Sequence, residues 1–361
     1  MRFYDALQQD PSVLKKKIRE AESPKEKRKL AAAMTARSFL IVLFAIMMIS
    51  PAAPLFGQEN SAMAVAMFCI FLGLRFVDFG CCIRDGLLTL AAAFLLLLLA
   101  PCAAAQVGFL LAAVIHCTAF FTILFLTSRR PEMGNAGLYT FAYIYLSGDP
   151  VSGLLLGKRA LLTLVGYVLC AVILFVKHRK KNPSIRLWDQ VKQFRITDKT
   201  TQWHLQLALG VGLPLALGSA LHLPRAMWAA FACGSILGNF SAAPADVRPR
   251  LVQRLLGTLI GSAIYFLGCM LLPESLRPIF GPLGGICLGF CTQYRYKTAS
   301  NCLGALFMAT GLYGVEKSVF LRIGHNLVGV VFGYVFLVLY QKVMDRCFNR
   351  RTSDDMEIAS V

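Results

Sequence analysis

Apolar runs of bilayer-spanning length recur along this chain, and they leave few folds open to it. Two successive runs are LLTLAAAFLLLLLAPCAAA (87–105) and QVGFLLAAVIHCTAFFTILFLT (106–127). Each is close to the roughly 20 apolar residues that a helix needs to cross the hydrocarbon core. Hydrophobic residues fill 57% of the 361 positions and charged residues only 16%, whereas about a quarter of a soluble domain is charged. The sequence therefore predicts an all-α, polytopic membrane protein.

Hydropathy predicts about twelve transmembrane helices, separated by short polar segments. They lie near 39–55, 61–77, 86–105, 107–127, 135–147, 159–176, 203–221, 226–243, 255–272, 279–293, 299–314 and 320–340. The expected domains are a retained cytoplasmic segment (1–37), a first six-helix part (38–176), a basic cytoplasmic linker (177–202), a second six-helix part (203–345) and a cytoplasmic tail (346–361). The long charged stretch before the first run is unlike the short basic start of a signal peptide.

Basic residues are distributed unevenly about these segments. With the N-terminus inside, most of the 37 lysines and arginines fall on the cytoplasmic side, and the other side receives only Lys158, Arg159, Arg225, Arg277, Lys317 and Arg322. The positive-inside rule expects this bias. We therefore expect a multi-pass protein of the cell (inner, cytoplasmic) membrane, in contact with lipid and with both termini cytoplasmic. The net charge of +18 is explained by these anchors and gives no reason to expect nucleic-acid binding.

A short motif occurs once in each half of the chain. RALLTLVG (159–166) and RIGHNLVG (322–329) both read R-x4-L-V-G and lead into a long apolar run, and RDGLLTL (84–90) loosely resembles RLLGTL (254–259). An even number of spans per half would keep the two halves in one orientation. The pattern therefore predicts two parallel six-helix repeats, as in some secondary transporters.

Arg250 and Arg254 stand just before a GxxxG pair, Gly257 and Gly261. Small residues at this spacing let two membrane helices approach closely. Converging guanidinium groups would suit a carboxylate, which they bind in a planar, two-point geometry. Snorkelling to the headgroups and pairing with Asp246 are the structural alternatives. The predicted helix-packing residues are Gly257, Thr258, Gly261, Gly166 and Gly329.

Arg322, His325 and Asn326 are spaced i, i+3, i+4 and share one face of a helix. Polar groups are costly at that depth, and His325 could couple anion flux to protons because histidine titrates near neutral pH. An interfacial arginine beside a histidine that only packs between helices is the alternative. The predicted substrate-pathway residues are Arg250, Arg254, Arg322, His325, Asn326, Arg84 and Arg159.

Signals for catalysis, metals and cofactors are missing. The chain has no G-x-S-x-G, H-E-x-x-H or Walker-type motif. Cys81 with Cys82 and Cys287 with Cys291 are the closest cysteine pairs, and neither has a histidine or acid at ligand spacing. We expect no bound metal, no cofactor and no enzymatic activity.

Two stretches resemble a known family. WAAFACGSILGNFSAAPADVRPRLVQRLLGTLIGSAIYFL (228–267) contains R-x3-R-x2-G-T-x2-G, and R-I-x3-L-V-G-V runs from Arg322 to Val330. Together they resemble the membrane domain of the fusaric acid resistance protein-like family over most of residues 203–345. That family belongs to the aromatic acid exporter superfamily, which includes the plant aluminium-activated malate transporters.

The resemblance implies six-helix membrane units that pair and move organic anions, often aromatic carboxylates, out of the cytoplasm. In the malate transporters basic residues line the anion pathway, and the matching positions here are Arg254 and Arg322. We expect a transporter or channel-like exporter of small organic carboxylates, with its pathway between the two halves. Whether the protein also pairs as a homo-oligomer is left open. The alternatives are a membrane scaffold without transport, and an enzyme acting on a lipid, for which Asp78, Asp85 and Asp246 are the nearest acids.

Overall fold

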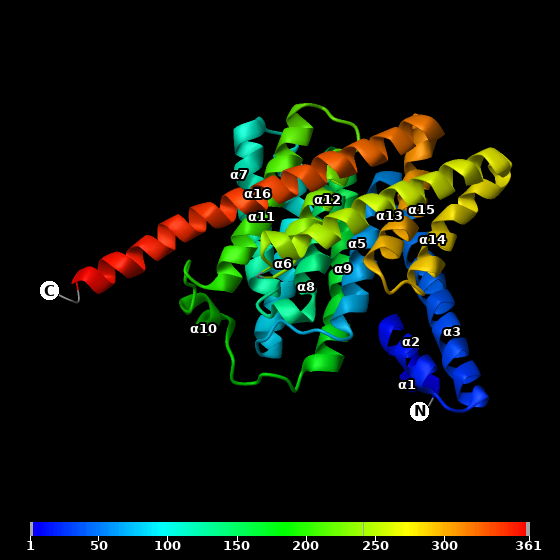
Figure 1. Ribbon diagram of the computed structural model, residues 1–361, viewed down its shortest axis with the longest axis horizontal. Coiled ribbons are helices and arrows are strands. Elements are labelled where there is room, and N and C mark those ends of the chain that lie inside the picture. The colour runs from blue at the N-terminus through cyan, green and yellow to red at the C-terminus, as the bar shows by residue number, and fades with distance from the viewer. Residues whose placement is uncertain (1–2, 241, 359–361) are drawn as a thin grey trace. The chain divides into compact units, whose positions relative to one another are not determined.

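The computed structural model describes residues 3–240 and 242–358, and every regular element in these residues is a helix (Figure 1). Each predicted span overlaps one longer helix: α3 (Pro24–Ile49), α5 (Ser61–Leu74), α6 (Ile83–Ala104), α7 (Phe109–Thr127), α8 (Asn135–Ser147), α9 (Gly153–His178), α11 (Lys199–Ala220), α12 (Met227–Leu237), α13 (Pro244–Leu271), α14 (Phe280–Leu288), α15 (Tyr294–Tyr313) and α16 (Val315–Ile358). The short elements are α1 (Phe3–Leu7), α2 (Pro11–Glu20), α4 (Ala52–Phe56), α10 (Leu187–Lys192), η1 (Gln58–Asn60), η2 (Pro131–Met133) and η3 (Glu274–Ile279).

Within the described residues, six helical segments are long and apolar enough to cross a membrane: Pro24–Phe56, α6, α7, α9, α13 and the Val315–Cys347 part of α16. α5 and α12 are apolar but shorter, at 14 and 11 residues, and α8 and α14 are also short, at 13 and 9 residues. α11 and α15 have the length but are less apolar. The chain is a multi-pass helical membrane protein, and twelve spans in two parallel repeats remain a prediction.

Helix boundaries differ most from the sequence where charged residues flank an apolar run. α3 begins at Pro24, about four turns before the predicted start, and α16 continues past residue 340 to Ile358. Lysine, arginine and glutamate are good helix formers, so the helix extends into flanks that hydropathy treats as loop. Most of the predicted tail, 346–361, therefore belongs to α16, and its last three residues lie outside the described part of the chain.

The chain forms two compact units, each assembled from distant segments. The smaller unit contains residues 1–48 and 248–327, and the larger unit contains residues 49–247 and 328–361. α3 thus joins α13, α14 and α15, while α11 and α12 join the helices of the first half. This division differs from the predicted halves on either side of the linker, so each half supplies helices to both units.

Small residues allow close helix packing in the larger unit. A Cβ at Gly212 of α11 would lie 3.1 Å from the backbone nitrogen of Cys117 in α7, and one at Gly333 of α16 would lie 3.2 Å from the Cα of Cys233 in α12. Ala104, Ala112, Ala113 and Ala216 form a buried alanine cluster among α6, α7 and α11. The predicted packing glycines Gly166 and Gly329 lie directly against Met67 and Ala229, respectively.

The N-terminal segment folds onto the start of α3 in the smaller unit. Asp10 caps α2 by accepting a hydrogen bond of 2.8 Å from the Ser12 N–H, and Pro11 fits the first helical position because its missing N–H is not needed there. Leu14 of α2 is buried with Ala6, Leu30 and Ala33. Further along α3, the Val42 side chain packs against α14: a Cβ added at Gly285 would lie 3.0 Å from Val42 Cγ2.

Candidate functional site

Two glycines fix the position of the predicted arginines in the smaller unit. A Cβ at Gly257 would lie 2.7 Å from the Cβ of Thr298, and one at Gly261 would lie 2.8 Å from the Cα of Ala299. α13 and α15 can cross this closely because both positions lack a side chain. The crossing places the start of α15 beside the turn of α13 that carries Arg254.

Arg254 is held by two neutral groups from other helices. Its Nε donates to Asn326 Oδ1 of α16 over 3.0 Å, and its Nη1 donates to the hydroxyl of Tyr294 over 3.2 Å. The Asn326 amide donates in turn to the Arg322 carbonyl over 2.8 Å, which turns its oxygen toward Arg254. Residues 72 positions apart in sequence thus meet at one guanidinium group.

Arg250 and Arg322 add positive charge beside Arg254. The Arg250 guanidinium carbon lies 4.5 Å from the centre of the Tyr294 ring, a distance at which the ring attracts a cation. The Arg322 side chain is only 5% exposed, and Arg254 and Cys302 are among the groups that interact with it electrostatically. We call Arg250, Arg254, Tyr294, Arg322 and Asn326 the arginine cluster.

The side-chain partners of Arg254 are neutral. Arg254 is half-buried, and no acidic side chain in the described part of the chain forms an ion pair with it; its partners are an amide oxygen and a phenol. Burial makes an unpaired charge costly, so a half-buried guanidinium group with neutral partners attracts an anion. A guanidinium group is well suited to a carboxylate.

A cleft of about 520 Å³ is lined by residues adjacent in sequence to the cluster. Its described lining is Gln253 of α13, Gln293 and Arg295, and each glutamine directly precedes a member of the cluster. The volume lies in the range typical of sites for small organic molecules, about 300–1,000 Å³. The amide and guanidinium groups of the lining provide hydrogen-bond donors for an anion.

The other predicted pathway residues have different surroundings. His325 is half-buried on α16 between Arg322 and Asn326 in sequence. Arg84 is exposed in the first turn of α6 and belongs to the larger unit. The structure therefore brings together Arg250, Arg254, Arg322 and Asn326, while the larger unit holds Arg84 and Arg159.

Arg159 is enclosed at one end of the larger unit and is 1% exposed. Its Nε donates to Asn60 Oδ1 over 2.8 Å, and its Nη2 donates to the carbonyls of Glu59 and Asp149 over 2.7 and 2.9 Å. These bonds connect η1, the loop before α9 and α9 itself. They favour a structural role for Arg159.

Tyr294 was missed as a site residue because QYRYK (293–297) has the composition of an interfacial aromatic belt. Tyrosine and basic residues at a membrane boundary usually form such a belt. In the structure Tyr294 is the first residue of α15 and contacts two arginines of α13. The signal in the sequence was the i, i+4 arginine pair, whose guanidinium groups can stack on or donate to an aromatic residue of a neighbouring helix.

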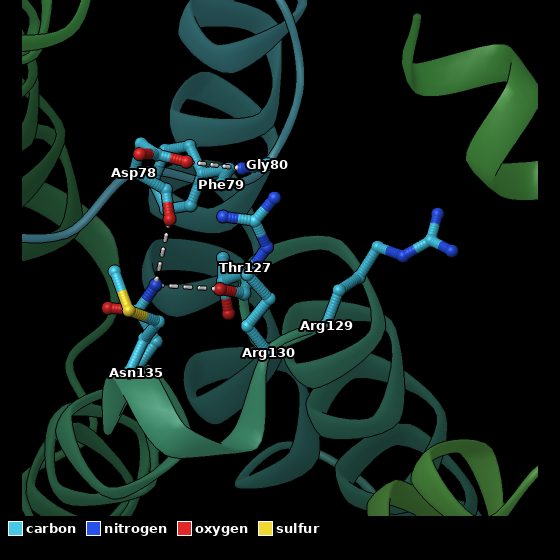
Figure 2. A pocket seen from close by; sticks show the side chains of 8 residues that line it. Asp78, Phe79, Gly80, Thr127, Arg129, Arg130 and Asn135 are labelled. Carbon is cyan, nitrogen blue, oxygen red and sulfur yellow. Dashed lines mark hydrogen bonds between the residues drawn. The ribbon is translucent and has the colours of Figure 1, made fainter. Parts of the chain in front are cut away.

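A second, much smaller crevice lies in the larger unit (Figure 2). Its lining includes Asp78, Gly80, Arg129, Arg130 and Asn135, and its volume is about 10 Å³, which holds no more than one water molecule. Figure 2 shows the Arg130 side chain extending toward Gly80, while Arg129 points away from the other labelled side chains. The crevice is too small for an organic substrate.

Aspartates beside this crevice hold the linker in place. Asp78 accepts hydrogen bonds from the Gly80 N–H (2.8 Å), Lys181 (3.2 Å) and Asn182 (3.3 Å), and Asp85 accepts from the Leu187 N–H at 2.7 Å. Partial burial acts to raise the pKa of Asp78, but the Gly80 and Lys181 hydrogen bonds outweigh it and hold that pKa below its ordinary value. The linker between the predicted halves is therefore attached to the α5–α6 loop through Asp78 and to the first turn of α6 through Asp85.

Comparison with known proteins identifies one region of the chain. Residues 213–336 match a family model described as fusaric acid resistance protein-like, and these residues include the GxxxG pair and the whole arginine cluster. Searches with the chain find no match among curated proteins or solved structures. The resemblance inferred from the sequence is confirmed over residues 213–336, about a third of the chain.

Proposed function

We propose that this protein transports small organic carboxylate anions, aromatic ones among them, across the cell membrane, and that the arginine cluster binds the anion. The observation that carries the proposal is Arg254, a half-buried cation whose partners, Asn326 and Tyr294, are both neutral. The matched family, named for resistance to fusaric acid, supports a role in export. Both termini would lie in the cytoplasm, as the distribution of basic residues indicates.

The membrane potential is sufficient to drive such an export. One elementary charge that crosses 100 mV changes its free energy by about 2.3 kcal/mol, and the negative cell interior favours exit of an anion. Arg254 and Arg250 would concentrate the anion beside the cleft lined by Gln253 and Gln293. A passive route needs no ATPase partner, and His325 is the residue through which proton coupling would act.

Two further functions have less support. An enzyme acting on a lipid would need acids that face one cavity. Asp78 and Asp85 instead accept hydrogen bonds from the linker, and Asp246 accepts from the Ala243 N–H at the start of α13. A scaffold without transport would not require an arginine without a counter-ion beside a cleft.

The direct test is flux of a panel of carboxylates in proteoliposomes, including benzoate, salicylate, succinate and malate. We expect wild-type protein to carry an electrogenic flux of at least one of them. Arg254→Ala should reduce that flux at limiting substrate at least tenfold, and Arg254→Lys should restore only part of it because lysine offers no two-point geometry.

Arg19→Ala provides the control, since it removes an exposed arginine of α2 in the same unit. Each variant is compared as monodisperse protein of similar melting temperature. Absence of flux for every panel member in folded wild-type protein would overturn the proposal. Flux that is equal in wild type and Arg254→Ala would remove Arg254 from the pathway.

A further inference from the structure

Polar side chains continue from the arginine cluster into the interior of the smaller unit. On α13 and α16 they follow one another at three or four residues, which keeps them on one face of each helix; on α15, Thr310 lies eight residues after Cys302. We call them the polar seam: Arg254, Thr258, Ser262 and Tyr265 of α13; Tyr294, Thr298, Cys302 and Thr310 of α15; and Ser318, Arg322 and Asn326 of α16.

Contacts between the helices fix the order of groups along the seam. Arg254 meets Asn326 and Tyr294 at one end. Arg322 and Cys302 interact further along, and the Tyr265 hydroxyl donates to Thr310 Oγ1 over 2.9 Å at the other end. With a rise of about 1.5 Å per residue, Arg254 and Tyr265 are separated by roughly 16 Å, about half of a hydrocarbon core of ~30 Å.

Two serines in the seam lack the usual hydrogen bond of a helical hydroxyl. Thr258, Thr298 and Thr310 each donate to the carbonyl four residues earlier, over 2.9, 3.0 and 2.8 Å. Ser262 and Ser318 are both 0% exposed, yet in the described part of the chain neither hydroxyl has a hydrogen-bond partner. Buried polar groups are nearly always satisfied, so these two call for an explanation.

The positions of the two serines relate them to the arginines. Ser318 lies one turn before Arg322 on α16, and Ser262 lies two turns after Arg254 on α13. A solute that leaves the arginine cluster along the seam would therefore meet both hydroxyls. A carboxylate oxygen accepts hydrogen bonds and a serine hydroxyl can donate one.

We propose that the polar seam is the route of the anion through the smaller unit, and that Ser262 and Ser318 donate hydrogen bonds to the carboxylate once it has left Arg254. This inference rests on the proposed transport function and assigns the path to one seam of three helices. In the structure the seam is closed, because Gly257 and Gly261 bring α13 directly against α15. Passage therefore requires α13 and α15 to separate.

The test uses Ser262→Ala and Ser318→Ala, alone and together, in the full-length protein in proteoliposomes. Removing a buried hydroxyl that has no partner should leave the melting temperature unchanged or raise it. Benzoate or succinate flux at limiting concentration should nevertheless fall roughly threefold to tenfold per serine, as expected when a net hydrogen bond is lost. A purely structural serine would not combine preserved stability with reduced flux.

Ser235→Ala is the matched control. Ser235 lies on α12 in the larger unit and donates to the Ala232 carbonyl over 2.7 Å, so its loss should not change flux. If flux falls in Arg254→Ala but not in either serine variant, the seam is a dry packing surface and this inference is wrong, while the transport proposal stands. If wild-type protein carries no flux, both are overturned.

Discussion

At the scale of single residues, the sequence predicted four of the five residues of the arginine cluster, all but Tyr294, but not the contacts between them. Arg254 was found through R-x3-R and GxxxG, and Asn326 through its spacing from Arg322. Nothing in either motif shows that an amide oxygen 72 residues away accepts the hydrogen bond of Arg254. Arg159 and Arg322 share the motif R-x4-L-V-G, yet their surroundings differ. Arg159 donates to two carbonyls and an amide oxygen, whereas Arg322 interacts with Arg254.

Asn326→Asp tests whether Arg254 must lack a counter-ion. The two side chains have the same shape, but the aspartate would place a carboxylate 3.0 Å from Arg254 Nε. That carboxylate would neutralise the positive charge that we propose binds the substrate. We expect the protein to fold and its anion flux in proteoliposomes to fall at least tenfold. Retained flux would show that the positive charge of Arg254 is not what binds the anion.

Asn60→Asp is the control for this change. Asn60 accepts a hydrogen bond of 2.8 Å from Arg159 Nε, so the substitution creates the same new pair in the larger unit. It also removes the donors that Asn60 gives to two backbone carbonyls, and some loss of stability is expected. Flux per folded protein should stay close to wild type; a large loss would return Arg159 to the pathway.

At the scale of helices, apolar content located the elements, and local chemistry decided where they end. All twelve predicted spans overlap a helix, because hydropathy reports the part of a helix that avoids water. It does not report the charged turns at the start of α3, nor how tightly two helices cross. The GxxxG motif predicted that α13 would cross another helix closely. It did not predict that this helix would be α15, since the motif carries no information about the partner.

Gly261→Ala tests the crossing of α13 and α15. An added Cβ would lie 2.8 Å from the Cα of Ala299 and from the Cβ of Cys302, which is closer than such atoms approach. Alanine favours a helix over glycine by about 1 kcal/mol, but overpacking typically costs about 1–3 kcal/mol. We expect a lower melting temperature in detergent.

Gly304→Ala makes the same change on α15, where nothing lies within 4 Å of the added atom. Only the helix propensity then remains, so the melting temperature should stay the same or rise. Equal behaviour of the two variants would show that the α13–α15 crossing is loose and that Gly261 does not determine it.

At the scale of the whole molecule, helices that are close in sequence do not always belong to the same compact unit. The basic linker suggested a division into two six-helix halves, whereas the compact units combine residues 1–48 with 248–327 and residues 49–247 with 328–361. Local sequence cannot reveal such an exchange, because each helix is apolar enough to pack with several partners. The exchange gives the matched family domain, residues 213–336, a share in both units.

Splitting the chain in the linker tests whether the halves depend on each other. Neither 1–183 nor 184–361 contains a complete unit: the first lacks α13–α15, and the second lacks α3 and the helices α5–α9. Each fragment expressed alone would expose helix faces that are buried in the intact protein, so we expect it to aggregate or be degraded. Expressed together, the fragments should copurify and show one melting transition, because every helix is again present. Monodisperse, thermally cooperative 184–361 obtained alone would mean that the second half is a self-contained domain and that the two halves do not each supply helices to both units.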